Sequence, residues 1–132
     1  MRREPITFFL DRNLGKKAFA RALREAGLIV QIHDDHFAVD SPDAEWLRVV
    51  GQKRWVVITN DRRMRYRPLE WMTFLNYGIR AFTFTSGSLT ARKMVEIFLK
   101  ARNQIFRLLD EKDKAFIAKM SQSGDVWVWK ES

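Results

Sequence analysis

The sequence of 132 residues contains no cysteine and only two histidines. The absence of cysteine excludes disulfide bonds and thiolate metal sites, and two histidines alone do not make a zinc site. No apolar run reaches the roughly 20 residues that a membrane-spanning helix needs. The opening MRREP leads directly into a strand-like segment, which is not the pattern of a signal peptide. We therefore expect a soluble, cytoplasmic protein with no membrane partner.

Acidic residues are outnumbered in this chain, with 16 Asp and Glu against 24 Lys and Arg, so that the formal net charge is +8. A strongly basic surface favours an anionic partner, and nucleic acid is the first candidate. The alternative is that the charge only keeps the protein soluble. The hydrophobic fraction of 46% is ordinary for a folded protein and allows a substantial core.

Short apolar runs alternate with helical patterns along the chain. We expect strands at residues 6–10, 28–32, 55–59, 81–85 and 126–129. We expect helices at residues 14–26, 41–51, 68–78, 89–109 and 112–120. This order predicts a single α/β domain over residues 1–132, with a mainly parallel sheet covered on both faces. Residues from about 110 to 132 could form an accessory helix–strand element.

Two helix boundaries and one helix face lead to specific expectations. Gly27 follows the first helix where a C-terminal glycine belongs, and Ser41-Pro42 suggests an N-cap followed by the first helical position. The apolar stripe of the longest helix fits either the core or a homodimer surface. Its members are Met94, Phe98, Ala101, Ile105 and Leu108.

Three carboxylates are candidates for a common site. Asp11 ends the first strand, and Asp61 lies two residues past the apolar end of the third. In an open α/β sheet, ligands bind outside the carboxyl ends of the strands. Asp43 lies in the first turn of a helix, on the face of Leu47 and Val50. Each aspartate alone fits a structural role, but three together repel one another and require a cation. Mg²⁺ or Mn²⁺, which prefer oxygen ligands, would supply it.

The segments FFLDRNL, SPDAEWL and VVITND carry a resemblance to a known family. At these separations they are similar to PIN-like nucleases, most closely to the subgroup of VapC-type toxins, over roughly residues 5 to 87. The resemblance implies a three-layer α/β fold with a central, mainly parallel sheet. It gives Asp11, Asp43 and Asp61 the role of metal-binding catalytic residues, and Asn13 matches the D-x-N-L pattern.

The segment after the third strand departs from the family pattern. The related segment often reads T-x-D-x-D-F, whereas this chain has Arg63 at the second acidic position. The fourth carboxylate is therefore missing unless another acidic residue replaces it; the candidates are Asp34, Asp35, Asp40 and Glu45. The same segment carries four arginines that could hold RNA phosphates through their forked guanidinium groups. They are Arg62, Arg63, Arg65 and Arg67. The alternative is a solvated basic loop.

Two further motifs have competing interpretations. His33-Asp34-Asp35-His36 looks like a metal cluster, but strand alternation would separate its side chains, which favours a polar loop at the rim of the site. Trp127 and Trp129 share one face of the last strand. Core packing is the preferred interpretation, and an exposed pair could instead stack bases or bind a partner protein.

Together with the carboxylates and the basic charge, the resemblance implies metal-dependent hydrolysis of RNA, and an antitoxin protein that blocks the site if the chain is a toxin. One alternative is an inert RNA-binding module of the same fold. A second is a phosphotransfer domain that uses Asp11 as the nucleophile. That class needs a lysine after a later strand, and the fourth strand ends in Thr85-Ser86-Gly87 without one.

Overall fold

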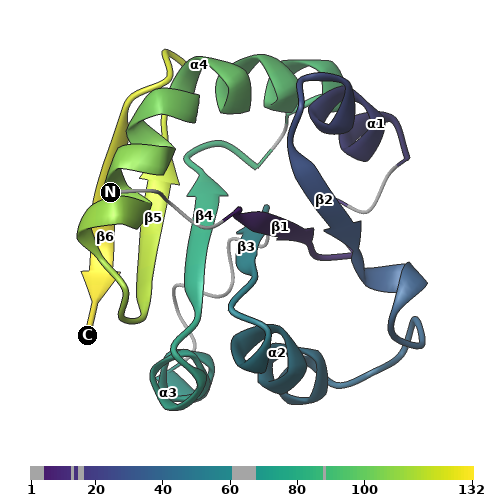
Figure 1. Cartoon of the computed structure of the whole chain (residues 1–132), viewed down its shortest axis with the longest axis vertical. Coiled ribbons are helices and arrows are strands. Elements are labelled where there is room, and N and C mark those ends of the chain that lie inside the picture. The colour runs from purple at the N-terminus through teal and green to yellow at the C-terminus, as the bar shows by residue number, and fades with distance from the viewer. Residues whose placement is uncertain (1–4, 13, 15–16, 61–67, 88) are drawn as a thin grey trace.

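The described part of the chain forms a six-stranded sheet between two pairs of helices, as the computed structural model in Figure 1 shows. The structure describes residues 5–12, 14, 17–60, 68–87 and 89–132, without the side chains of residues 68–70. The elements are β1 (Thr7–Leu10), α1 (Lys17–Glu25), β2 (Ile29–Ile32), α2 (Asp43–Gln52), β3 (Val56–Thr59), α3 (Pro68–Tyr77), β4 (Arg80–Phe84), α4 (Ala91–Glu111), β5 (Phe116–Met120) and β6 (Val126–Glu131). Within these ranges, no helix has the length and hydrophobicity that a membrane span requires.

The strands are ordered β2-β1-β3-β4-β5-β6 across the sheet. All neighbours are parallel except β5 and β6, which form an antiparallel pair at one edge. The mainly parallel sheet predicted from the alternation of strands and helices is therefore confirmed. This topology brings the carboxyl ends of β1 and β3 side by side at one edge of the sheet, where parallel strands bind ligands.

Each face of the sheet is covered by one pair of helices, which lie on opposite sides of it in Figure 1. α1 and α4 pack on the face that carries Phe8 and Leu10 of β1. α2 and α3 pack on the face that carries Phe9. The stripe on α4 lies inward, with Met94 and Phe98 buried among the sheet side chains. The stripe is therefore core.

The prediction of a helix at residues 112–120 is wrong, because Phe116–Met120 forms the strand β5. The first three residues of β5 and Met120 are buried, and the strand pairs in parallel with β4. A short apolar run of this length does not reveal its own periodicity, so helix and strand cannot be told apart from it. The charged residues before it end α4 at Glu111 instead of continuing the chain as a helix.

The start of α2 also differs from expectation. The helix begins at Asp43, and Pro42 occupies the N-cap position, which has no side-chain hydrogen bond. Ser41 is therefore not the N-cap. The expected glycine at the end of α1 is confirmed, because Gly27 has a φ of 90°, which a residue with a side chain rarely adopts. The start of α2 matters for the site because it puts Asp43 in the first turn of that helix.

The prediction that the two tryptophans of β6 pack in the core is also wrong. Trp127 is 43% exposed and Trp129 is 36% exposed. The alternating valines, Val126 and Val128, point to the opposite side and pack against the core beneath α4. Alternation in VWVW shows that two faces exist, but the residue types alone do not tell which face is inside.

Candidate functional site

Asp11 lies at the carboxyl end of β1 and is buried, with 4% of its surface exposed. Its backbone N–H donates to the Ile58 carbonyl at 3.2 Å, which continues the β1–β3 ladder by one residue. The side chain is held at both oxygens. The backbone N–H of Leu14 donates to Oδ1 at 3.2 Å, and the Thr59 hydroxyl donates to Oδ2. A carboxylate in this setting has a fixed position and orientation.

Thr59 is a site residue that the sequence pattern did not indicate. It ends β3, is 1% exposed, and its hydroxyl bonds to Asp11 across the two neighbouring strands. Thr83 of β4 lies directly opposite Thr59 in the sheet register and is also buried. Among the residues that the structure describes, its Oγ1 has no hydrogen-bond partner. Thr59 is the threonine of the Thr59-Asn60-Asp61 segment. Its hydrogen bond to Asp11 depends on the pairing of β1 with β3, which the sequence does not show.

Asp43 is half-buried at the start of α2, and its Oδ1 accepts a hydrogen bond of 3.0 Å from the indole nitrogen of Trp46. The ring of Trp46 packs on Phe9 of β1, with 5.3 Å between ring centroids. Phe9 is two residues before Asp11 in the sequence, so α2 is fixed to the strand that carries the first carboxylate. The Arg12 guanidinium, which donates to the Val39 carbonyl, ties the loop before α2 to the end of β1.

The His33-Asp34-Asp35-His36 motif forms a short 3₁₀ turn at His33–Asp35. His33 is buried among the rings of Phe9, Phe37 and Trp46, and its Nδ1 lies 3.0 Å from Asp34 Oδ1. His36 is exposed and bonds to Gln31 instead. The two histidines therefore face different surroundings, and the polar-loop interpretation describes the motif better than a metal cluster does.

Several expected site residues lie outside the residues that the structure describes. They are Asn13, Asp61, Arg62, Arg63, Arg65 and Arg67. Among the described residues, no three His, Cys, Asp or Glu side chains come together as a metal site. The expected triad is thus represented by two members, Asp11 and Asp43. The acidic residues considered as a fourth ligand are all exposed; they are Asp34, Asp35, Asp40 and Glu45.

The donors that are described suit a hard divalent cation. Both Asp11 and Asp43 offer carboxylate oxygens, which are the ligands that Mg²⁺ and Mn²⁺ prefer. A carboxylate buried as deeply as Asp11 is normally hydrogen-bonded and paired with a cation or a metal ion. Each of the two aspartates is already oriented by a neutral donor, which fixes its direction without adding charge. The donor chemistry of Asp11 and Asp43 therefore fits such an ion.

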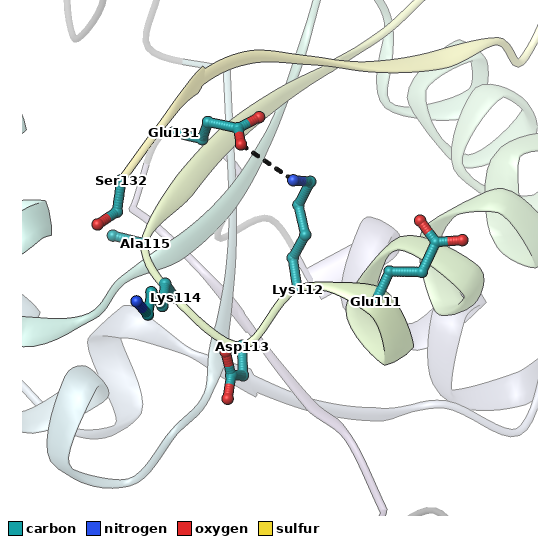
Figure 2. A pocket seen from close by; sticks show the side chains of 7 residues that line it. All are labelled: Glu111, Lys112, Asp113, Lys114, Ala115, Glu131 and Ser132. Carbon is teal, nitrogen blue, oxygen red and sulfur yellow. Dashed lines mark hydrogen bonds and ion pairs between the residues drawn. The ribbon is translucent and has the colours of Figure 1, made fainter.

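A hollow of about 160 Å³ lies on the side of the sheet away from Asp11, beside the start of β5 and the end of β6 (Figure 2). Lys112 and Glu131 form an ion pair of 3.0 Å across it, and the side chains of Glu111 and Asp113 point away from that pair. This hollow lies beyond the amino end of β5. Its charged groups are exposed, apart from the half-buried Lys112, so this hollow does not resemble the surroundings of the buried Asp11.

Two arginines near this hollow have a structural role. Arg80 is buried at the start of β4 and donates to the Arg54 carbonyl at 3.0 Å, while Arg54 donates to the Asp113 carbonyl at 2.8 Å. Burial, with a smaller effect of the Arg54 charge, lowers the pKa of Arg80 to about 10. Backbone carbonyls accept from both guanidinium groups, so these two cations join the turn before β3, the start of β4 and the turn before β5.

Comparisons with known proteins relate the sequence to one family. A family model described as a PIN-like domain matches residues 6–86. A protein of Mycobacterium tuberculosis named "Putative ribonuclease VapC45" is 24% identical over 103 residues, which are 75% of this chain and 75% of that protein. No solved structure matches the chain at a significant level. The family match spans β1 to β4 with all three candidate aspartates, and ends before α4, β5 and β6.

Proposed function

The chain belongs to the PIN-like domain family, and on that premise we propose that it is a ribonuclease that uses a divalent metal ion. The observation that carries the proposal is the buried carboxylate of Asp11 at the carboxyl end of β1, with the Thr59 hydroxyl and the Leu14 N–H directed at it. The ribonuclease name of the relative from Mycobacterium tuberculosis supports the same activity.

Asp11, Asp43 and Asp61 would hold Mg²⁺ or Mn²⁺. When bound, the ion would activate water and stabilise negative charge on the phosphate oxygens. The protein's own contribution is orientation. The Thr59 hydroxyl fixes Asp11, and the Trp46 indole fixes Asp43, so neither carboxylate has to be ordered when the substrate binds.

The basic segment after β3 would bind the RNA backbone. Arginine presents two parallel N–H groups to a phosphate, which positions the chain on either side of the bond to be cleaved. The residues proposed for this role are Arg62, Arg63, Arg65 and Arg67. Asn13, two residues after Asp11, would position a metal ligand or a water molecule. The net charge of +8 supports attraction of RNA to this surface.

We further propose that the protein acts in the cytoplasm as the toxin of a toxin–antitoxin pair. An antitoxin protein would then block the acidic site, and the toxin could act as a homodimer. The name of the relative supports this proposal. A small neighbouring gene for a DNA-binding antitoxin would be the expected genetic arrangement.

An inert RNA-binding module of the same fold is the second candidate. It is favoured by Arg63, which stands where the related segment often carries a second acidic residue. Losing that carboxylate would weaken metal binding or reduce the number of metal ions. In this case the protein would bind RNA without cleaving it.

Cleavage of single-stranded RNA in millimolar Mn²⁺ separates these two candidates. We expect Asp11→Asn and Asp61→Asn to lower the rate by about a hundredfold or more, since losing even the partners of metal ligands costs about 10- to 100-fold. The control is Asp113→Asn, an exposed aspartate beyond the opposite edge of the sheet, which should cleave like the wild type.

Two results would contradict the proposal. If Asp11→Asn cleaves as fast as the wild type, the proposed site is wrong. If the wild type binds RNA but does not cleave it with either Mn²⁺ or Mg²⁺, the inert module replaces the ribonuclease.

A further inference from the structure

The β5–β6 pair exposes aromatic side chains on a face that the proposed reaction does not use. Trp127 and Trp129 are 43% and 36% exposed, whereas most large apolar side chains of this protein are buried. Single exposed apolar residues need no explanation, but two tryptophans on the same edge strand do. Trp127 lies opposite Lys119 of β5, so a cation stands beside the first of these rings.

A register shift between β5 and β6 puts Trp129 and Lys130 on the same face of the sheet as Trp127. Ile117 pairs with Lys130 and Ala118 pairs with Val128, so Trp129 has no residue opposite it. Such a bulge lets two consecutive side chains emerge on the same side. The ammonium groups of Lys119 and Lys130 lie 5.0 Å and 5.4 Å from the centre of the Trp129 ring.

This face is continuous with the side of the sheet that α2 and α3 cover only in part. The core beneath these helices includes Ile117 of β5, but no described residue of β6. Trp71 of α3 borders the uncovered part, and Lys130 lies 5.4 Å from the centre of its ring. We call the surface formed by Lys119, Trp127, Trp129 and Lys130 the tryptophan–lysine face.

The sheet register relates the tryptophan–lysine face to the acidic site. Thr59 pairs with Thr83, Thr83 with Lys119, and Lys119 with Trp127, in a single row across four strands. The Thr59 hydroxyl at one end of this row bonds to Asp11 on the next strand. Strands are about 4.8 Å apart, so Trp127 lies roughly 19 Å from Asp11 along the sheet. A bound polymer of several nucleotides could reach both.

We propose that the tryptophan–lysine face binds single-stranded RNA and holds the substrate beyond the point of cleavage. This inference rests on the proposed ribonuclease function and adds a second contact region for its substrate. Exposed aromatic rings stack on bases of any sequence, and neighbouring lysines neutralise phosphates. Lysines alone would be explained as protection of an edge strand against aggregation, but that role does not call for tryptophan. The net charge of +8 favours a polyanion over an apolar partner.

The test measures binding of the full chain to a fluorescein-labelled single-stranded RNA of about ten nucleotides, within the usual site sizes of such proteins. A chelator prevents cleavage during the titration. We expect Trp127→Thr, which removes the ring but suits a strand, to weaken binding about tenfold. Trp127→Phe keeps an aromatic ring and should bind within about twofold of the wild type.

The charge contribution has its own matched pair of variants. Lys119→Gln should lower the slope of log Kd against log salt by about 0.7, the value for one phosphate contact to a single strand. Lys100→Gln removes an equally charged side chain that is exposed on α4 and should leave the slope unchanged. Thermal melts of all four variants establish that each one is folded.

Cleavage kinetics distinguish a failure of this inference from a failure of the proposed function. With Mn²⁺, Trp127→Thr should raise KM for a long RNA without changing kcat, and should leave cleavage of a dinucleotide unchanged. If the wild type cleaves nothing but Trp127→Thr weakens RNA binding, the ribonuclease proposal fails and the RNA-binding face stands. If Trp127→Thr and Lys119→Gln bind RNA like the wild type, the inference is overturned. It is also overturned if these variants bind RNA like the wild type but no longer bind a protein that the wild type binds.

Discussion

The acidic end of β1 and β3 differs from the tryptophan–lysine face in how it presents polar and aromatic groups. Asp11 and Thr59 are buried and hydrogen-bonded to each other, while Trp127 and Trp129 are exposed beside two lysines. A reacting group needs a fixed position, which burial and hydrogen bonds provide. A surface that binds a flexible polymer needs accessible rings and charges. The fold therefore separates the chemistry from the contact with substrate that we propose.

The family match follows the same division. It covers residues 6–86, which include the acidic end, and it stops before the strands that carry the tryptophan–lysine face. The acidic end is thus part of what this chain shares with its family. The β5–β6 pair is where the family model gives no guidance, and its role rests on the structure alone.

The largest effect on stability is expected from the threonine that orients Asp11. Thr59→Val removes a hydroxyl that donates to a buried carboxylate, and leaving such a group short of a donor costs about 1–3 kcal/mol. Thr83→Val is the matched control, because Thr83 is equally buried in the neighbouring strand and its hydroxyl oxygen has no partner among the described residues. We expect Thr83→Val to be nearly neutral.

Chemical denaturation of the two valine variants measures this difference as the change in the free energy of unfolding. Equal losses in both variants would mean that the Asp11–Thr59 bond does not distinguish the acidic end from the rest of the sheet. In that event the orientation attributed to Thr59 would have to be abandoned.

A smaller effect is expected at Asp43, where the hydrogen bond and the charge can be separated. Asp43→Asn keeps an oxygen for the Trp46 indole and loses the attraction to the helix N-terminus, worth about 0.5 kcal/mol. It also loses the repulsion from the other aspartates, so its stability without metal should stay within about 0.5 kcal/mol of the wild type. Asp43→Ala loses both interactions and should cost about 1.5 kcal/mol. Both variants should cleave RNA poorly, because both remove a metal ligand. An active Asp43→Asn would show that this carboxylate serves α2 and not the reaction.

The parallel part of the fold was predictable because its strands are buried on both sides. Continuous apolar runs such as Val56–Thr59, each followed by a helical pattern, indicate a parallel sheet without further information. The β5–β6 pair was less predictable. Phe116–Met120 is short, and its pairing with β4 depends on residues more than 30 positions earlier in the chain. Local patterns carry no information about that pairing.

The acidic site was predictable in its residue types but only partly in its contacts. Asp11 and Asp43 follow from their places at the end of a strand and the start of a helix. The bond from Trp46 to Asp43 joins residues three positions apart in α2, a spacing that the sequence does contain. The donor that orients Asp11, Thr59, is brought to it by the pairing of β3 with β1, which no spacing in the sequence records. For the same reason, the outward direction of Trp127 became clear only from the packing of β6 against α4.

Thermal melts test most directly whether Asp11 at the end of β1, Asp61 after β3 and Asp43 at the start of α2 form the proposed metal site. The wild type and Asp11→Asn would each be melted with a chelator and with millimolar Mn²⁺. Metal at a hundred times its Kd should stabilise the wild type by about 2.7 kcal/mol and the variant much less. With the chelator, Asp11→Asn should melt at the higher temperature, because clustered carboxylates repel one another when no cation is bound. If Mn²⁺ leaves the wild type unchanged and Asp11→Asn is the less stable protein in the chelator, these carboxylates do not form a metal site.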